Sequence, residues 1–238
     1  MIFLFDDFGS GGPYAGQVKA VLQERAPKVP VIDLMHDAPA HNPRPGAHLL
    51  AALAGRLPGA SVTLAVVDPG VGGPREPVAV LADGRWLVGP DNGLISVAAA
   101  RAKESEAYTI GWRPKELSAS FHGRDLFAPV AAMLARGDRK TVKLKKAALA
   151  VALGADDLDE VIYVDRFGSL VTGVRAAAVP RTRKLVINGR DIPYARVFSE
   201  VKPGEVFWYE NSLGLVEVAA NSASAQRALG FKPGNPLG

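Results

Sequence analysis

Cysteine is absent from the 238 residues of this chain, which excludes disulfide bonds and thiolate catalysis and suits a reducing cytoplasm. Long hydrophobic runs are missing too: none approaches the roughly 18 apolar residues of a membrane-spanning helix, so we expect no membrane span. The apolar start, Met1–Phe5, has no basic flank and turns acidic at Asp6, which favours a buried first strand over a signal peptide. These absences predict a cytoplasmic globular protein.

Several motifs of common enzyme classes are also missing. The chain has no HExxH or Cys/His zinc pattern, no GxSxG nucleophile elbow and no Walker A loop. His36, His41 and His48 stand near Asp33 and Asp37, but histidine spacings of five and seven do not place two imidazoles on one helix turn. We therefore predict no metal site, no serine nucleophile and no phosphate loop.

The net charge of +4 raises the question of a nucleic-acid partner. The densest basic stretch, Arg136–Lys146, contains no aromatic residue that would stack on bases. A solvated basic surface is the favoured interpretation, and we expect no nucleic-acid partner.

The first half of the chain alternates short apolar runs with segments of helical periodicity. Strands are expected at residues 2–5, 29–34 and 61–67, and helices at residues 14–25, 44–57, 94–102 and 125–135. Asp83-Gly84-Arg85 indicates a hairpin between residues 77–82 and 86–89. Strands that alternate with helices predict an α/β domain with a mostly parallel sheet, over residues 1–145.

The second half consists of short apolar runs separated by turn residues. Strands are expected at residues 161–164, 170–174, 184–187, 196–199, 206–209 and 215–219. Asn188-Gly189 predicts a type I′ hairpin between two of them. Many short strands at close spacing predict a small all-β, barrel-like domain over residues 155–238.

Two glycine-rich loops, each following an expected strand or hydroxyl-rich run, carry the best candidates for chemistry. One loop has Asp68 at the strand end and Arg75 at its far side, and the other contains His122. Loops at strand ends are where open α/β folds assemble ligand sites. A carboxylate, a guanidinium and an imidazole can together hold and polarise a water molecule without a metal. The alternatives are a surface Asp68–Arg75 ion pair and a hydrogen-bonded core histidine.

A third glycine-rich turn, Asp6–Pro13, joins the first expected strand to the first helix and suits an anionic or polyhydroxyl ligand. It is not a GxGxxG motif. Asp7 can accept hydrogen bonds from both hydroxyls of a ribose. The alternative is that Asp6 or Asp7 caps the helix or forms an Asx turn.

Six motifs follow one another along nearly the whole chain. They are Asp7-Phe8-Gly9 with Pro13-Tyr14-Ala15-Gly16, Val67–Gly72 with Arg75, Gly89–Leu94, Phe121–Asp125, Asp165–Gly168 and Asn211–Glu217. In this order they resemble the S-adenosyl-L-methionine (SAM) hydroxide adenosyltransferases, the SAM hydrolase relatives of the fluorinase and chlorinase.

The resemblance implies an α/β domain for nucleoside binding and catalysis, a small β-barrel domain and a homotrimer with sites between subunits. It implies that SAM and water react to give adenosine, as the bound product, and L-methionine, without a cofactor or metal. Asp68, Arg75 and His122 match the family's catalytic triad, and Asp7 matches its ribose-binding aspartate. The other matched positions lie around the nucleoside: Phe121, Phe167, Ser169, Ser212, Glu217 and Ala220.

Some positions depart from the family pattern. Gly12 stands where relatives have an aspartate near the methionine end, Ser169 replaces an asparagine, and His41-Asn42 replaces an aromatic-aspartate pair. Two alternatives to SAM hydrolysis therefore stay open. One is a non-catalytic protein that binds adenosine or SAM, and the other is a hydrolase of a different adenosyl substrate.

Overall fold

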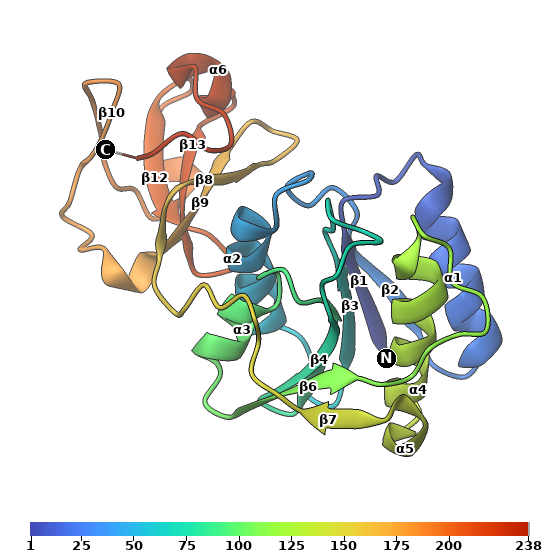
Figure 1. Cartoon of the computed structure of the whole chain (residues 1–238). Coiled ribbons are helices and arrows are strands. Elements are labelled where there is room, and N and C mark those ends of the chain that lie inside the picture. The colour runs from blue at the N-terminus through green and yellow to red at the C-terminus, as the bar shows by residue number, and fades with distance from the viewer. Residues whose placement is uncertain (238) are drawn as a thin grey trace. The chain divides into compact units, whose positions relative to one another are not determined.

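The computed structural model describes residues 1–237, and the chain divides into two compact units, Met1–Ala155 and Asp156–Gly238 (Figure 1). The first unit alternates strands and helices, and the second consists largely of strands. Each unit has its own hydrophobic core.

The first unit is built on a seven-stranded sheet with the strand order β2-β1-β3-β5-β4-β6-β7. Its strands are β1 (Ile2–Asp6), β2 (Val31–Met35), β3 (Val62–Val66), β4 (Pro77–Ala82), β5 (Arg85–Pro90), β6 (Ser105–Ile110) and β7 (Leu144–Lys146). The pairs β1–β2, β1–β3 and β3–β5 are parallel, whereas β4 is antiparallel to β5 and β6, and β7 is antiparallel to β6. All strands except β4 and β7 therefore run in one direction, which confirms the mostly parallel sheet.

Helices cover both faces of this sheet (Figure 1). They are α1 (Pro13–Arg25), α2 (Pro43–Ala54), α3 (Ser96–Arg101), α4 (Ala128–Ala135) and the short α5 (Arg139–Val142), and one π-helical turn, η1 (Gly123–Phe127), leads into α4. α1 packs against α4, and α2 packs against α3. The expected helix at 125–135 is thus partly π-helical. A π-turn inserts one extra residue, a deviation that is frequent at functional sites.

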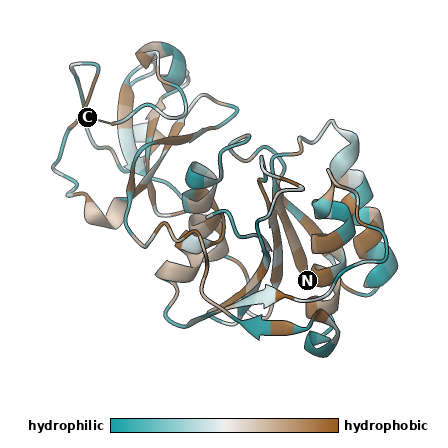
Figure 2. Ribbon diagram, viewed as in Figure 1, coloured by the Kyte–Doolittle hydropathy of each residue, from teal (hydrophilic) through white to brown (hydrophobic). Residues whose placement is uncertain are grey.

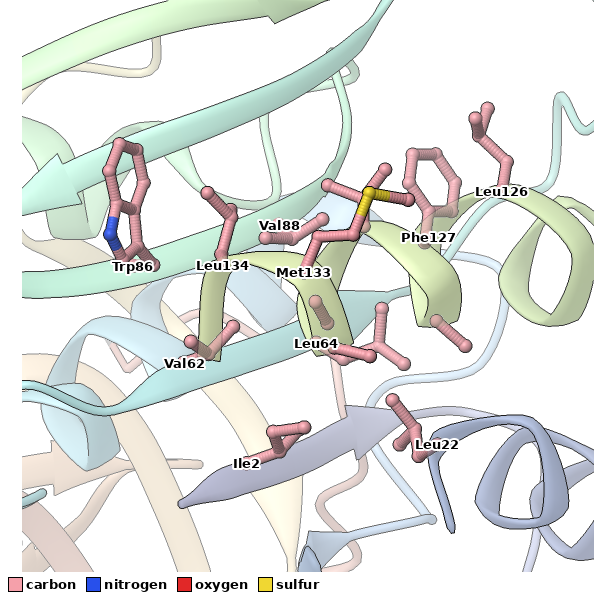
Figure 3. Close-up of a cluster of buried hydrophobic side chains, with 14 of the residues drawn as sticks. Ile2, Leu22, Val62, Leu64, Trp86, Val88, Leu126, Phe127, Met133 and Leu134 are labelled. Carbon is pink, nitrogen blue, oxygen red and sulfur yellow. The ribbon is translucent and has the colours of Figure 1, made fainter. Parts of the chain in front are cut away.

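The largest core cluster lies between the sheet and the pair α1 and α4 (Figure 3). Alternate residues of the central strands point into it, because successive side chains of a strand face opposite sides. Ile2 and Leu4 of β1 and Leu64 of β3 meet Leu22 of α1 and Met133 of α4. Figure 2 shows the same pattern, with hydrophobic residues concentrated on the inner strands. This core fixes the ends of β1 and β3, from which the site loops start.

The second unit contains a four-stranded antiparallel sheet with the order β12-β13-β9-β8. Its elements are β8 (Leu158–Val164), β9 (Leu170–Arg175), β12 (Val206–Glu210) and β13 (Leu215–Ala220), the hairpin β10 (Leu185–Ile187) and β11 (Arg190–Ile192), the 3₁₀ turns η2 (Ala176–Ala178) and η3 (Phe198–Glu200), and α6 (Ala225–Leu229). The all-β character predicted for this part of the chain is confirmed.

The prediction of a strand at residues 196–199 is wrong, because residues 196 and 197 form a bend and η3 begins at Phe198. The Asn188-Gly189 hairpin exists, but its second strand is β11. Asn188 and Gly189 both have positive φ, at 51° and 72°, as a two-residue type I′ turn requires, so the chain pairs again immediately after the turn.

Strands β6 and β7 were not expected from the sequence. Both are rich in polar residues, and β7 consists of Leu144 and two lysines. They are strands because β4 and β6 offer them backbone partners, a contact that periodicity cannot reveal.

Candidate active site

A cavity of about 260 Å³ opens in the first unit where β1 and β3 end. These two strands are parallel neighbours, with Asp6 opposite Val66, so the loops that follow them start side by side. The segment just before η1, together with His41 from the loop after β2, completes the wall. The cavity is lined by residues Asp7, Phe8, Tyr14, His41, Val66, Asp68, Val71, Ser120, Phe121, His122 and Gly123.

Asp68, Arg75 and His122 form one hydrogen-bonded cluster at this cavity. Arg75 Nε donates to both carboxylate oxygens of Asp68, at 2.9 and 2.8 Å, and Arg75 Nη2 also contacts Asp68 Oδ2. The same Nη2 lies 3.1 Å from Nδ1 of His122. The guanidinium therefore links a carboxylate and an imidazole that are 54 residues apart in sequence.

Arg75 contacts Asp68 and His122 from the side that faces away from the cavity lining. Asp68 and His122 line the cavity, whereas the Arg75 guanidinium lies over the ring of Phe127, at 5.6 Å from its centroid. A guanidinium has donors only, so it orients the two groups that face the cavity. The sequence had suggested a guanidinium beside the reacting water; in the structure Arg75 contacts Asp68 and His122 and is not among the residues that line the cavity.

His122 is held in its neutral form. Burial lowers the pKa of His122, and the positive charge of Arg75 lowers it further. Because Nδ1 faces a guanidinium donor, it accepts this hydrogen bond, and the ring proton is assigned to Nε2.

Tight backbone contacts fix the loop that carries Asp68 and Arg75. Gly72 has a φ of +82°, and a Cβ there would lie 2.5 Å from the carbonyl oxygen of Ala119, in the loop before His122. Asn92 Nδ2 donates to the carbonyl oxygen of Val67 at 2.8 Å. The motif Gly89–Leu94 therefore has a structural role: its asparagine anchors the backbone that precedes Asp68.

Asp7 and three aromatic rings form another part of the cavity wall. Phe121 meets Phe8 and Tyr14 edge to face, with centroid distances of 5.8 and 5.3 Å. Asp7 Oδ2 accepts a hydrogen bond from the backbone N–H of His41 at 3.0 Å. The helix-capping alternative for Asp6 and Asp7 is wrong, because α1 begins after Gly12 without a side-chain cap, but Asp6 does form the Asx turn, since its Oδ1 accepts from the Phe8 N–H at 3.1 Å.

The second unit contains a cavity of its own, of about 990 Å³, and four of the nucleoside positions line it: Phe167, Ser169, Glu217 and Ala220. Asp165 Oδ1 accepts from the backbone N–H groups of Phe167 and Ser169, at 2.9 and 2.8 Å, which shapes the turn. The Phe167 side chain is left 72% exposed.

Glu217 is buried in this second cavity with both carboxylate oxygens occupied. Tyr209 Oη donates to Oε1 at 2.6 Å, and Asn211 Nδ2 donates to Oε2 at 2.9 Å. Burial and this bond to Glu217 raise the pKa of the Tyr209 hydroxyl, which keeps it a donor. Ser212 is exposed in the turn between β12 and β13 and does not line the cavity. The matched residues thus fall into two groups, one in each unit, with Ser212 outside both.

Among residues 1–237, no cluster of three or more histidine, aspartate or glutamate side chains has the geometry to hold a metal ion. None of the helices within the same range is long and apolar enough to cross a membrane.

Comparison with known proteins assigns the family. Residues 2–144 match the model of the SAM hydroxide adenosyltransferase N-terminal domain, and residues 159–238 match that of the C-terminal domain. The chain therefore belongs to the SAM hydroxide adenosyltransferase family, which confirms the resemblance found in the six motifs.

Named relatives and solved structures cover almost the whole chain. An (R)-S-adenosyl-L-methionine hydrolase of Thermus thermophilus is 41% identical over 99% of this chain and 98% of its own length. A protein with the same name from Salinispora arenicola is 38% identical over 97% and 94%. The crystal structure of an uncharacterized conserved protein from Thermotoga maritima superposes with a TM-score of 0.89 at 29% identity, over 99% of this chain and 98% of that one.

Proposed function

We propose that this protein hydrolyses SAM to adenosine and L-methionine by attack of water or hydroxide at C5′ of the ribose. The observation that carries the proposal is the cluster of Asp68, Arg75 and His122 in the cavity that Asp7 also lines. The family assignment and relatives named (R)-S-adenosyl-L-methionine hydrolase support it.

In this reaction the protein's main task is to supply the nucleophile. When the water oxygen bonds to C5′, the C5′–S bond breaks, and its electron pair converts the sulfonium into the neutral thioether of methionine. This leaving group needs no acid, so the protein must activate a water molecule and aim it.

The cavity-facing groups divide this task. His122 Nε2–H donates to the water oxygen, and the Asp68 carboxylate accepts the proton that leaves it. Arg75 keeps both groups in position through its hydrogen bonds to Asp68 and His122, and its positive charge favours the developing hydroxide. We assign catalysis to Asp68 and His122 and orientation of the pair to Arg75.

Aiming the water requires a fixed ribose. Asp7 Oδ2 is already bound by the His41 N–H, which leaves Oδ1 to accept a ribose hydroxyl. Phe121 presents an aromatic surface in the same cavity. The remaining nucleoside contacts are proposed for Phe167, Ser169, Ser212, Glu217 and Ala220.

We further propose that the protein acts in the cytoplasm as a homotrimer, binds the nucleoside at subunit interfaces, needs no metal or cofactor, and has no nucleic-acid partner. Light scattering coupled to size exclusion, with and without adenosine, tests the assembly. A monomer in both conditions would contradict it.

The experiment that tests the function is incubation of the pure protein with SAM, followed by chromatography for adenosine and methionine. Asp68→Asn and His122→Ala are expected to abolish turnover and to leave adenosine affinity largely unchanged. Asp68→Asn is chosen because its side chain has the same shape and still offers one oxygen as an acceptor to the Arg75 guanidinium. Wild-type rates in either variant would exclude this mechanism. Adenosine binding without any turnover of SAM by the wild type would indicate a binding protein instead.

A further inference from the structure

The buried carboxylate of Asp6 has no part in the proposed reaction, yet it directly precedes Asp7. Asp6 is 3% exposed, and both of its carboxylate oxygens face Nδ1 of His36, at 2.9 and 3.0 Å. On the other side of the ring, His36 Nε2 lies 3.1 Å from Asp33 Oδ1, and Asp33 Oδ2 accepts from Lys19 at 2.7 Å. A chain of alternating charges therefore runs from the surface of α1 to the end of β1.

Asp6 and His36 are hydrogen-bonded to the backbone just after Asp7, the candidate ribose-binding residue. Asp6 Oδ1 accepts from the Phe8 N–H at 3.1 Å, and the carbonyl oxygen of His36 accepts from the Gly9 N–H at 2.6 Å. Asp7 and Phe8, which lie between these bonds, both line the cavity that contains Asp68 and His122. Movement of the Asp6–His36 pair would therefore move the cavity wall.

The surroundings favour a charged pair. Burial by itself would lower the pKa of His36, but the carboxylates of Asp6 and Asp33 outweigh it and raise that pKa. Burial raises the pKa of Asp6, and His36 and the Phe8 N–H oppose this rise. The charged groups that face the pair are Asp33 from β2, Lys19 from α1 and the neighbouring Asp7.

We propose that Asp6 and a protonated His36 form a positioning pair that holds Asp7 and Phe8 in the orientation that binds the nucleoside. Nucleoside affinity then depends on the charge of His36, whereas the chemical step at Asp68 and His122 does not. This inference rests on the proposed function in one respect: the ligand held by Asp7 is a nucleoside.

The test is adenosine binding by calorimetry between pH 6 and 9, combined with steady-state kinetics on SAM. His36→Ala is expected to weaken adenosine binding and raise KM about tenfold, the effect of losing one charge-assisted hydrogen bond, with little change in kcat. His36→Asn keeps an amide donor at the position of Nδ1. It is expected to restore part of the affinity at pH 7 and to abolish the loss of affinity that the wild type shows at alkaline pH.

Asp33→Asn separates positioning from general stability. It leaves the Asp6–His36 contact in place but removes one of the two carboxylates that hold the proton on His36. The alkaline loss of affinity is therefore expected to begin at lower pH, with wild-type affinity at pH 6. Glu106→Gln is the matched control, because it breaks another lysine–carboxylate contact of 2.7 Å on the surface and should change neither property.

The outcomes are distinct. A His36→Asn protein that binds adenosine with the wild-type affinity and the wild-type pH profile would overturn the positioning role and leave SAM hydrolysis intact. A loss of kcat with unchanged KM in His36→Ala would also overturn it. A wild-type protein that neither binds adenosine nor hydrolyses SAM would reject the proposed function and, with it, this inference.

Discussion

Replacing Gly72 with alanine is the sharpest test of how the site is assembled. Gly72 lies in the loop between Asp68 and Arg75, with a φ of +82° that costs a residue with a side chain about 1–2 kcal/mol. The new Cβ would lie 2.5 Å from the Ala119 carbonyl oxygen, against 3.4 Å for ordinary contact. The two loops must therefore separate by about 0.9 Å, and displacements of about 1 Å at a reacting site cost on the order of 100-fold in rate.

We expect Gly72→Ala to lower the free energy of unfolding by about 2 kcal/mol and kcat for SAM hydrolysis by about 100-fold. Denaturant unfolding and product chromatography measure the two effects. Gly70→Ala is the control on the same loop, since a Cβ there meets nothing within 4 Å, and it should behave like the wild type. A Gly72→Ala protein with full activity would refute the idea that contact between these loops aligns Asp68, Arg75 and His122.

Three further predictions concern protonation, the second cavity and metals. Burial and the charge of Arg75 lower the pKa of His122, so kcat should stay constant at neutral pH and fall only below about pH 6.5. At acidic pH the imidazole gains a proton on Nδ1 and loses the hydrogen bond that Arg75 donates to it. A fall in kcat that begins above pH 7 would contradict this prediction. Phe167→Ala should change the free energy of unfolding by no more than about 0.5 kcal/mol, because the side chain is 72% exposed. The same variant should bind adenosine about tenfold more weakly. An unchanged adenosine affinity in calorimetry would show that Phe167 is not part of the binding site. Turnover should be unchanged after exhaustive chelation, and recovery of a lost rate by added Mg²⁺ or Zn²⁺ would disprove the metal-free proposal.

Local sequence signals accounted for most elements of the fold. The Asn188-Gly189 turn was predictable because both residues tolerate the positive φ of a type I′ hairpin. The second strand of that hairpin was misplaced at residues 196–199, although a two-residue turn pairs the chain again at once, Ile187 with Arg190; the polar start of β11 concealed this strand from the hydrophobic pattern. Strands β6 and β7 were missed for the related reason that their polar residues become strands only beside β4 and β6.

The candidate site was predictable in part. Asp68 and Arg75 stand on the loop after β3 and His122 stands just before η1, where the hydroxyl-rich run at residues 118–120 is not a strand; in the structure the three come together, and their catalytic roles stay a prediction. The sequence did not indicate that Asp68 and His122 line the cavity while Arg75 does not, because this depends on the packing of the Arg75 guanidinium over Phe127.

The role of His36 was likewise not predictable from the sequence. In the sequence it counted only as a member of an improbable metal site, since its contact with Asp6 spans 30 residues. Parallel pairing of β1 with β2 brings the two residues together, and no spacing rule within one segment can reveal such a contact.

The sequence by itself determined the family, the order of α/β and all-β parts, and the residue types available for chemistry, because motifs, periodicity and turn residues are local properties of the chain. The tertiary structure alone decided which of these residues touch, which face a cavity, and which charges are held away from water. Those properties depend on strand pairing and on close backbone approaches, such as that of Gly72 to Ala119, between segments distant in sequence.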